Sequence, residues 1–131
     1  MRVLVAEDDV ANRKFLVKLL ERYGEVTVVE DGMSAVDAFA KAVKDEILFD
    51  LVCMDIMMPK IDGYKALEAL REAERKLGVV ADKRTKVIMI SALDEVGLAT
   101  DHICSDYDAY ICKPIDIDKF LELIRKLGIQ V

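Results

Sequence analysis

Five short apolar runs alternate along the chain with longer segments in which apolar residues recur at helical spacing. The runs lie at residues 3–6, 26–29, 51–54, 87–90 and 109–112, and they are nearly continuous in Val, Ile and Leu. Strands that are buried on both faces of a parallel sheet have this composition. The alternation therefore predicts an α/β fold, with five parallel strands in an open, doubly wound sheet and helices on both faces.

The segments between the runs predict the helices that cover this sheet. Their apolar stripes are Phe15, Leu16, Leu19 and Leu20; Val36, Phe39 and Val43; Leu67, Leu70, Ala73 and Leu77; and Ile117, Phe120, Leu121 and Ile124. We expect these stripes to form core contacts. Gly24, Gly78 and Gly128 mark helix ends, because a left-handed helix cap favours glycine. Residues 93–106 should hold a further helix, fourth in chain order, although Gly97 weakens its pattern.

Length and charge limit the class of protein. A chain of 131 residues fits one domain, residues 1–131, and lacks the run of about 18 apolar residues that a membrane span needs. The N-terminal MRVLVAEDD turns acidic too early for a secretory signal, so we expect a cytoplasmic protein. A net charge of −6 with scattered basic residues argues against direct binding of nucleic acid.

The cysteines and the single histidine predict little chemistry. Three cysteines without paired spacings suggest neither a zinc site nor a disulfide framework. Cys53 and Cys112 lie in apolar runs and are expected in the core, while Cys104 stays open. His102 alone cannot build a histidine metal cage, and we expect it on a helix surface.

Polar residues follow four of the five apolar runs. They are Glu7, Asp8 and Asp9 after the first run, Asp55 after the third, Ser91 after the fourth, and Lys113 with Pro114 after the fifth. Parallel strands bring their carboxyl ends to one edge, which is where open α/β sheets bind ligands. Carboxylates gathered there repel one another unless a proton or a cation intervenes. Mg²⁺ suits such a site because it prefers oxygen ligands and is usually held by one or two carboxylates.

With a metal ion bound, this group of residues could carry out phosphoryl chemistry. Asp55 would be an ionised nucleophile toward phosphorus, and Lys113 would share the charge of the phosphoryl group. Ser91 would offer a hydrogen bond to one phosphoryl oxygen. Each feature alone has a simpler interpretation: the acidic run could cap a helix, Ser91 could be a turn or cap residue, and proline after a strand is ordinary. Their joint placement at strand ends favours the site.

The sequence resembles response-regulator receiver domains of bacterial two-component signalling, of the kind seen in the chemotaxis regulator. The motifs are VLVAEDD, MDIMMPKIDG, MISA and YICKP, and the match spans essentially the whole chain. The resemblance implies a flavodoxin-like sheet with strand order 2-1-3-4-5. It implies that Glu7 and Asp8 form an acidic pair, that Asp55 is phosphorylated and that the main-chain carbonyl of Met57 also binds Mg²⁺.

The same resemblance implies roles for the remaining motif residues. Ser91 would be the switch hydroxyl, Tyr110 the switch aromatic and Lys113 the phosphoryl-binding lysine. The bond to Pro114 would be cis. Pro59 and Gly63, with Met58 and Asp62 beside them, would shape the loop after the phosphoacceptor.

The implied function is that of a signalling module rather than an enzyme, one that catalyses only its own phosphorylation and dephosphorylation. It would take a phosphoryl group from a histidine kinase or a phosphotransfer protein, with Mg²⁺ as cofactor. It would then present an altered surface to an output protein or domain that the sequence does not identify. No membrane or nucleic-acid partner is expected.

Three segments depart from the usual receiver pattern. CSDYDA replaces a small, glycine-containing stretch before the fifth run, so the loop there is expected to differ in shape. GVVADKRTK (78–86) is long and charged, and would be either an extension of the third helix or a mobile loop. Nothing follows Val131, which suggests a stand-alone regulator or an excised receiver.

Two other functions share some of these features. A haloacid-dehalogenase-type phosphatase also uses Mg²⁺ and an aspartyl phosphate, but it needs a second Asp two residues after the first, and Asp8 is followed there by Val10. A pseudo-receiver that no longer accepts phosphate would not need the intact site. Met57 and Leu93 stand where receivers place side chains near the attacking water, and two apolar residues there predict slow loss of the phosphoryl group.

Overall fold

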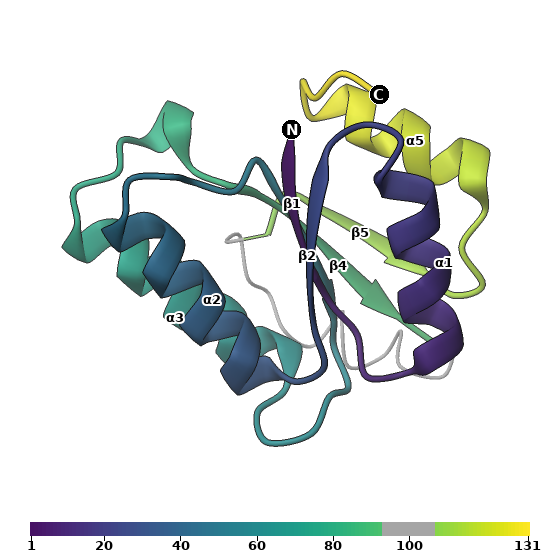
Figure 1. Cartoon of the computed structure of the whole chain (residues 1–131), viewed down its shortest axis with the longest axis horizontal. Coiled ribbons are helices and arrows are strands. Elements are labelled where there is room, and N and C mark those ends of the chain that lie inside the picture. Colours follow the sequence, from purple (N-terminus) through teal and green to yellow (C-terminus); the bar gives the residue numbers. More distant parts are fainter. Residues whose placement is uncertain (93–106) are drawn as a thin grey trace.

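The computed structural model describes residues 1–92 and 107–131, and these form the predicted parallel sheet (Figure 1). Its strands are β1 (Arg2–Ala6), β2 (Glu25–Val29), β3 (Leu51–Asp55), β4 (Lys86–Ser91) and β5 (Ala109–Cys112). They are all parallel and lie in the order β2-β1-β3-β4-β5. The predicted α/β class and strand order are therefore confirmed.

Helices cover both faces of the sheet (Figure 1). The helices α1 (Val10–Leu20) and α5 (Ile117–Lys126) lie on one face, and α2 (Gly32–Lys44) and α3 (Gly63–Lys76) lie on the other. The predicted helix within residues 93–106, with His102 and Cys104, lies outside the described residues.

Each of these four helices begins with an aspartate N-cap. The capping residues are Asp9, Asp31, Asp62 and Asp116. Each carboxylate accepts a hydrogen bond from the backbone N–H three residues further on, which satisfies one of the donors that a helix leaves unpaired at its start. Because three of these caps follow β1, β2 and β3, they fix where the chain leaves the carboxyl edge of the sheet.

The central strands contribute to two separate core layers. Leu4 and Val52 face the cluster under α2 and α3, whereas Val3 and Leu51 face the cluster under α1 and α5. Alternate residues of a strand point to opposite faces of the sheet. A strand that is covered by helices on both faces therefore needs an apolar residue at every position. The prediction of burial on both faces is wrong for β2, where Val28 is 37% exposed, and for β5, whose four residues are only half-buried, because these two strands lie at the sides of the sheet.

Three residues of the predicted core stripes are exposed. They are Phe15, Leu77 and Ile117, with exposed fractions of 36%, 59% and 44%. Leu77 is the C-cap of α3 and Ile117 is the first residue of α5, so both lie beyond the part of the helix that the sheet covers. Phe15 lines a shallow pocket between α1 and α5.

Two of the three predicted glycine helix ends are confirmed. Gly78 and Gly128 have φ angles of 71° and 89°, in the left-handed region. Gly24 is different, because α1 already ends at Leu20 and a Cβ on Gly24 would lie 2.0 Å from the carbonyl oxygen of Met1. This glycine permits a close approach to the N-terminus and does not cap the helix.

The charged segment 78–86 is not an extension of α3. It contains a single 3-10 turn at Ala81–Lys83 and then enters β4.

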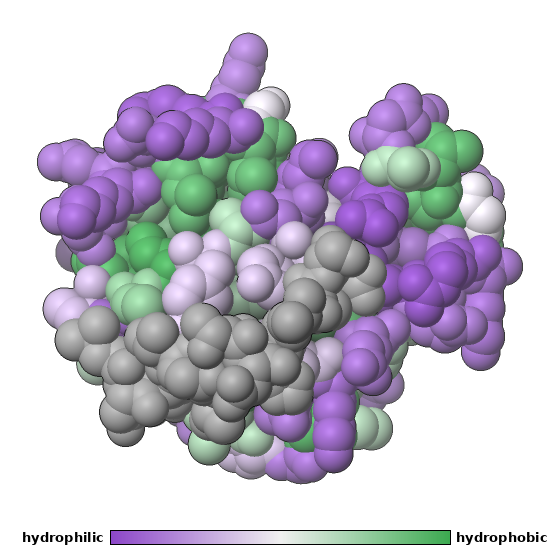
Figure 2. Space-filling model, turned by 180° about the vertical axis from the view of Figure 1, so that it is seen from behind, coloured by the Kyte–Doolittle hydropathy of each residue, from purple (hydrophilic) through white to green (hydrophobic). Residues whose placement is uncertain are grey.

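None of the helices in the described part of the chain has the length and apolar composition needed to cross a bilayer. Seen from behind, the described part of the surface is mostly hydrophilic, with smaller hydrophobic areas among the hydrophilic residues (Figure 2).

Candidate functional site

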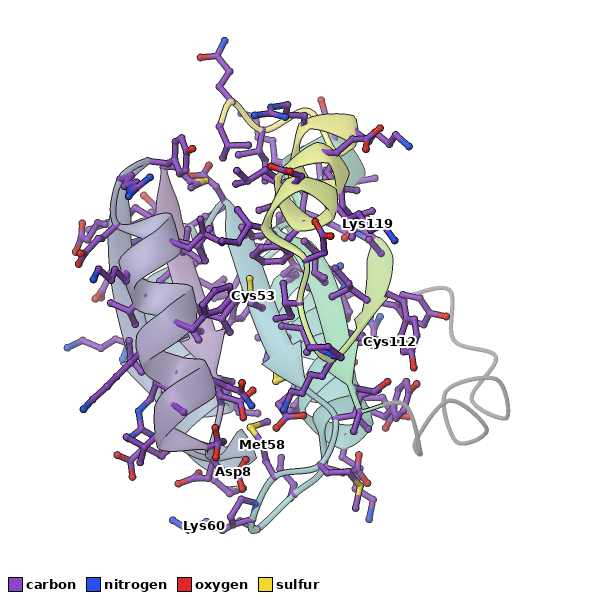
Figure 3. The ribbon with its side chains drawn as sticks, turned by 90° about the vertical axis from the view of Figure 1, so that its right-hand side faces the viewer. Asp8, Cys53, Met58, Lys60, Cys112 and Lys119 are labelled. Atoms are coloured by element: carbon purple, nitrogen blue, oxygen red, sulfur yellow. The ribbon has the colours of Figure 1, made fainter. Side chains whose placement is uncertain are left out.

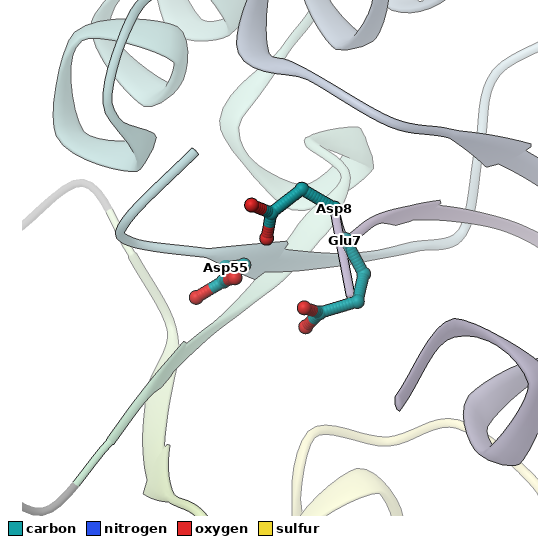
Figure 4. A group of neighbouring side chains, drawn as sticks. All are labelled: Glu7, Asp8 and Asp55. Atoms are coloured by element: carbon teal, nitrogen blue, oxygen red, sulfur yellow. The ribbon is translucent and has the colours of Figure 1, made fainter. Parts of the chain in front are cut away.

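Three carboxylates meet at the carboxyl edge of the sheet (Figure 4). Glu7 and Asp8 directly follow β1, and Asp55 is the last residue of the neighbouring strand β3. One carboxylate oxygen from each lies within 4.8 Å of the others. Glu7 and Asp55 are buried and Asp8 is exposed, so the cluster has one side open to solvent.

Lys113, just after β5, contacts two of these carboxylates. Its Nζ lies 3.3 Å from Oε1 of Glu7 and 3.4 Å from Oδ2 of Asp55. The side chain of Lys113 is 21% exposed. Burial alone would lower the pKa of Lys113, but the charges of Asp55 and Glu7 outweigh it and raise that pKa above its usual value. The lysine therefore stays a cation in the site.

One cation does not balance three carboxylates. Burial, reinforced by the neighbouring Glu7, raises the pKa of Asp55 to about 8, although Lys113 acts in the opposite direction. Asp55 thus takes up a proton near neutral pH when no further cation is present. A second positive charge would restore its ionised form.

A divalent ion fits these residues. Oε2 of Glu7 is buried and lies 3.3 Å from Nζ of Lys113, yet it accepts no well-aligned hydrogen bond from the described residues. An oxygen-only set of carboxylates, with an unused buried acceptor and one solvent-exposed side, matches the preference of Mg²⁺ for oxygen ligands and retained waters.

The two predicted switch residues contact each other. The buried hydroxyl of Ser91, at the end of β4, forms a hydrogen bond with the phenolic hydroxyl of Tyr110 on β5. Ser91 is also tied to the lysine loop, since its carbonyl oxygen accepts a hydrogen bond of 2.6 Å from the backbone N–H of Lys113. The Lys113–Pro114 peptide is cis, as the resemblance implies.

The loop between β3 and α3 carries the remaining predicted residues. Met57, two residues after Asp55, is 52% exposed, and Pro59 is also exposed. Gly63 starts α3, and a Cβ there would lie 2.5 Å from the carbonyl oxygen of Asp55. Glycine at position 63 thus lets α3 begin directly against the end of β3. Leu93, the second residue of the lifetime prediction, lies outside the described residues.

Asp9 in the loop after β1 and Arg13 in the first turn of α1 position Glu7, and neither was predicted to do so. The backbone N–H of Asp9 donates to Oε1 of Glu7 at 3.1 Å, while its side chain caps α1. Arg13 donates from Nη1 to the carbonyl oxygen of Glu7 at 3.2 Å. The capping role of Asp9 agrees with the expectation that the acidic pair is Glu7 and Asp8 alone. Nothing in the sequence pattern marks Arg13.

The described cysteines lie outside this chemistry. Cys53 is fully buried in β3, and burial raises the pKa of its thiol to about 12, which confirms the predicted core role. Cys112 is only half-buried, and its Sγ lies 3.8 Å from the hydroxyl of Tyr110.

Comparison with known proteins places this site in a family context. Residues 3–125 match the family model of the response regulator receiver domain. The chain is 38% identical over 128 residues to the chemotaxis protein CheY of Treponema pallidum, covering 96% of this chain and 81% of that protein. It is 34% identical over 125 residues to the hybrid signal transduction histidine kinase I of Dictyostelium discoideum.

That second match covers 95% of this chain and only 7% of the kinase. The fold is also similar to a mutant receiver domain of the histidine kinase CKI1 from Arabidopsis thaliana. The TM-score is 0.83 at 28% identity, over 97% of this chain and 88% of the CKI1 domain.

Proposed function

The chain belongs to the response regulator receiver family, and from this membership we propose that Asp55 accepts a phosphoryl group from a histidine kinase or phosphotransfer protein. Glu7, Asp8 and the main-chain carbonyl of Met57 would hold Mg²⁺ together with Asp55. The proposal treats residues 1–131 as a single receiver domain acting in the cytoplasm. The observation that carries it is the contact of Lys113 with both Glu7 and Asp55 inside the carboxylate cluster.

The side chains of the site divide the chemistry among them. An oxygen of ionised Asp55 forms the new bond to phosphorus as the bond from phosphorus to the donor breaks. Lys113 is positioned to share the negative charge of the transferred group. When bound, Mg²⁺ supplies further positive charge and favours the ionised form of Asp55.

The Ser91–Tyr110 contact supports a signalling role for the same site. The hydroxyl of Ser91 bonds to Tyr110 in the structure, so drawing it toward a phosphoryl oxygen would break this hydrogen bond. Such a change shifts an existing equilibrium between two arrangements rather than creating a new fold. The surface near β5 would then differ between the two forms.

Labelling by a small phosphodonor tests the proposal. With acetyl phosphate, the purified protein should gain one phosphoryl group in millimolar Mg²⁺ and none in EDTA, as measured by intact mass. The mass increase should be lost on mild alkaline treatment, because an acyl phosphate hydrolyses readily. A protein that binds Mg²⁺ but is never labelled would be a pseudo-receiver, and the proposed phosphoacceptor role would be wrong.

The same preparation separates the phosphatase alternative. A haloacid-dehalogenase-type enzyme turns over generic phosphomonoesters, so p-nitrophenyl phosphate would be hydrolysed catalytically. We expect no turnover beyond the buffer rate. Sustained turnover that is lost when Asp8 is replaced, the residue that stands where such a phosphatase has its nucleophile, would overturn the assignment as a signalling module.

The lifetime of the phosphorylated form should be long. The exposed side chain at position 57 is a methionine, which cannot orient an attacking water or accept its proton. Replacing Met57 by Asn, together with Leu93 by Glu, should shorten the lifetime by about tenfold or more, since a well-placed proton-transfer group typically contributes about 10²–10⁴-fold. The lifetime is measured as the loss of label from the isolated phosphoprotein in Mg²⁺ buffer. Met33→Asn is the control, because Met33 is an exposed methionine on α2. If the double variant loses its label at the wild-type rate, the side chains at positions 57 and 93 do not set the lifetime.

A further inference from the structure

The turn between β2 and α2, residues 29–32, contacts both loops that carry the candidate metal ligands. It contributes no ligand itself, and nothing in its sequence marks it as part of the site. We call these four residues the brace. On one side the brace meets the loop after β1, and on the other side it meets the loop between β3 and α3.

Toward the first loop, the brace holds the backbone of Glu7 at both ends of the residue. The N–H of Glu7 donates to the carbonyl oxygen of Val29 at 3.1 Å. Arg13 bonds to the carbonyl oxygen of Glu7 at 3.2 Å, and the same guanidinium lies 3.5 Å from a carboxylate oxygen of Glu30. The brace is therefore bonded to Glu7 directly at its N–H, and is linked to its carbonyl oxygen through Arg13 of α1.

Toward the second loop, the brace makes an ion pair and a close backbone contact. Asp31 caps α2 through the N–H of Ser34 at 2.8 Å, and its other oxygen lies 3.5 Å from Nζ of Lys60. A Cβ on Gly32 would lie 2.4 Å from the carbonyl oxygen of Ile61 and 2.6 Å from its Cγ1. Only glycine at position 32 lets the loop come this near to the start of α2.

The loop held in this way is strained. Lys60 has a φ of 72°, in the left-handed region that is unfavourable for a residue with a side chain. Such a conformation persists only where surrounding contacts impose it. Lys60 lies at the same end of the molecule as Asp8, at the carboxyl edge of the sheet (Figure 3). The contacts of Lys60 and Ile61 with the brace thus hold the loop in its path together with the loop's own backbone hydrogen bonds, from the N–H of Ile61 to Pro59 and from the N–H of Gly63 to Ile56.

We propose that the brace is a positioning element for the metal site, with Gly32 and Asp31 as its principal positioning residues. It sets the distance between the loop of Glu7 and Asp8 and the loop that follows Asp55. Mg²⁺ accepts only a narrow, nearly octahedral arrangement of oxygens, so a small displacement of one loop against the other should weaken its binding. This inference rests on the proposed Mg²⁺ site.

Gly32→Ala is the direct test, with Gly24→Ala as its matched control. In both variants a new methyl group meets a backbone oxygen, of Ile61 at 2.4 Å and of Met1 at 2.0 Å. Gly24, however, directly precedes β2, so it lies at the amino ends of the strands, opposite the carboxyl ends where the carboxylate cluster lies. Isothermal titration of the metal-free full chain with MgCl₂ gives the Kd, and circular dichroism confirms that each variant is folded.

We expect Gly32→Ala to raise the Kd for Mg²⁺ about tenfold, as is typical when a group that supports metal ligands is disturbed. Gly24→Ala should bind as the wild type does, even if its melting temperature falls. Equal Kd values for Gly32→Ala and the wild type would overturn the brace as a positioning element, and so would an equal loss in both variants. A wild type that binds no Mg²⁺ would instead contradict the proposed metal site.

A second variant keeps the test decisive if Gly32→Ala does not fold. Asp31→Ser retains a side-chain oxygen that can cap α2 but removes the carboxylate that faces Lys60. Asp116→Ser makes the same change at the N-cap of α5, where no lysine pair is lost among the described contacts. We expect a weaker Mg²⁺ titration for Asp31→Ser alone. Matching Kd values for the two serine variants would overturn the role of Asp31.

Discussion

Asparagine in place of Asp55 should abolish phosphoryl incorporation and, in metal-free buffer at pH 8, make the protein more stable than the wild type. The first effect follows because an amide cannot act as the carboxylate nucleophile. The second follows from the cost of ionising Asp55 in the folded protein. Loss of function and gain of stability from one substitution would show that this residue is placed for chemistry.

The direction of the stability effect follows from the pKa of Asp55. Burial and the Glu7 carboxylate raise this pKa from 3.8 to about 8 in the folded protein. Between these two values the folded state binds more protons than the unfolded state, so the free energy of unfolding falls as pH rises. The contribution of Asp55 is fully present below pH 3.8 and is lost as pH passes 8.

The amide side chain of the Asp55→Asn variant carries no charge and removes this dependence. We expect a gain of about 2 kcal/mol at pH 8, less than the full pKa shift would give because solvent reaches the site beside the exposed Asp8. Urea unfolding in EDTA from pH 4 to pH 8 measures the difference in the free energy of unfolding between the variant and the wild type. Asp37→Asn, on the exposed face of α2, is the control. Parallel stability curves for the wild type and Asp55→Asn would contradict the raised pKa.

The positions of the site residues could be predicted because they depend on topology. Once the apolar runs are assigned as parallel strands, Asp55 and Lys113 must come to one edge whatever the intervening loops do. The structure places both there, 3.4 Å apart. The prediction needed only strand identity and direction, which are the most robust features of a strongly apolar sequence pattern.

The contacts that hold the loops could not be predicted in this way. Lys60 reads as an ordinary exposed lysine, yet it adopts a left-handed φ and pairs with Asp31 of another loop. Gly24 reads as a helix end in the sequence, because its close approach to Met1 depends on how two distant segments meet. These features arise from tertiary contacts, and local propensity contains no signal for them.

A buried ionic network is the clearest case of such a feature. Arg71 of α3 is 1% exposed, and its Nη1 donates to Oε1 of Glu74 and to the carbonyl oxygen of Thr85, each at 2.8 Å. Its Nη2 donates at 3.1 Å to Asp108, which precedes β5 and also accepts the N–H of Val87 at 2.8 Å. The network ties α3 to the starts of β4 and β5, at the amino edge of the sheet, opposite the carboxylate cluster.

Arg71→Met should therefore destabilise the fold strongly. Removing the guanidinium leaves the carboxylates of Glu74 and Asp108 without their shared cation, and a buried charge that loses its partner costs about 3–5 kcal/mol. Arg75→Met is the matched control, because Arg75 pairs with Glu72 on the same helix with side chains 61% and 51% exposed. An exposed pair of this kind contributes about 1 kcal/mol or less.

Urea unfolding at pH 7 distinguishes the two variants, and Arg71→Met with Glu74→Gln identifies the cause of the loss. If uncompensated charge dominates, neutralising Glu74 should recover part of the stability, because a buried site tolerates a neutral pair better than a lone carboxylate. If the double variant is no more stable than Arg71→Met, the loss comes from the hydrogen bonds to Thr85 and Asp108 instead. Equal costs for Arg71→Met and Arg75→Met would show that the network contributes no more than a surface ion pair.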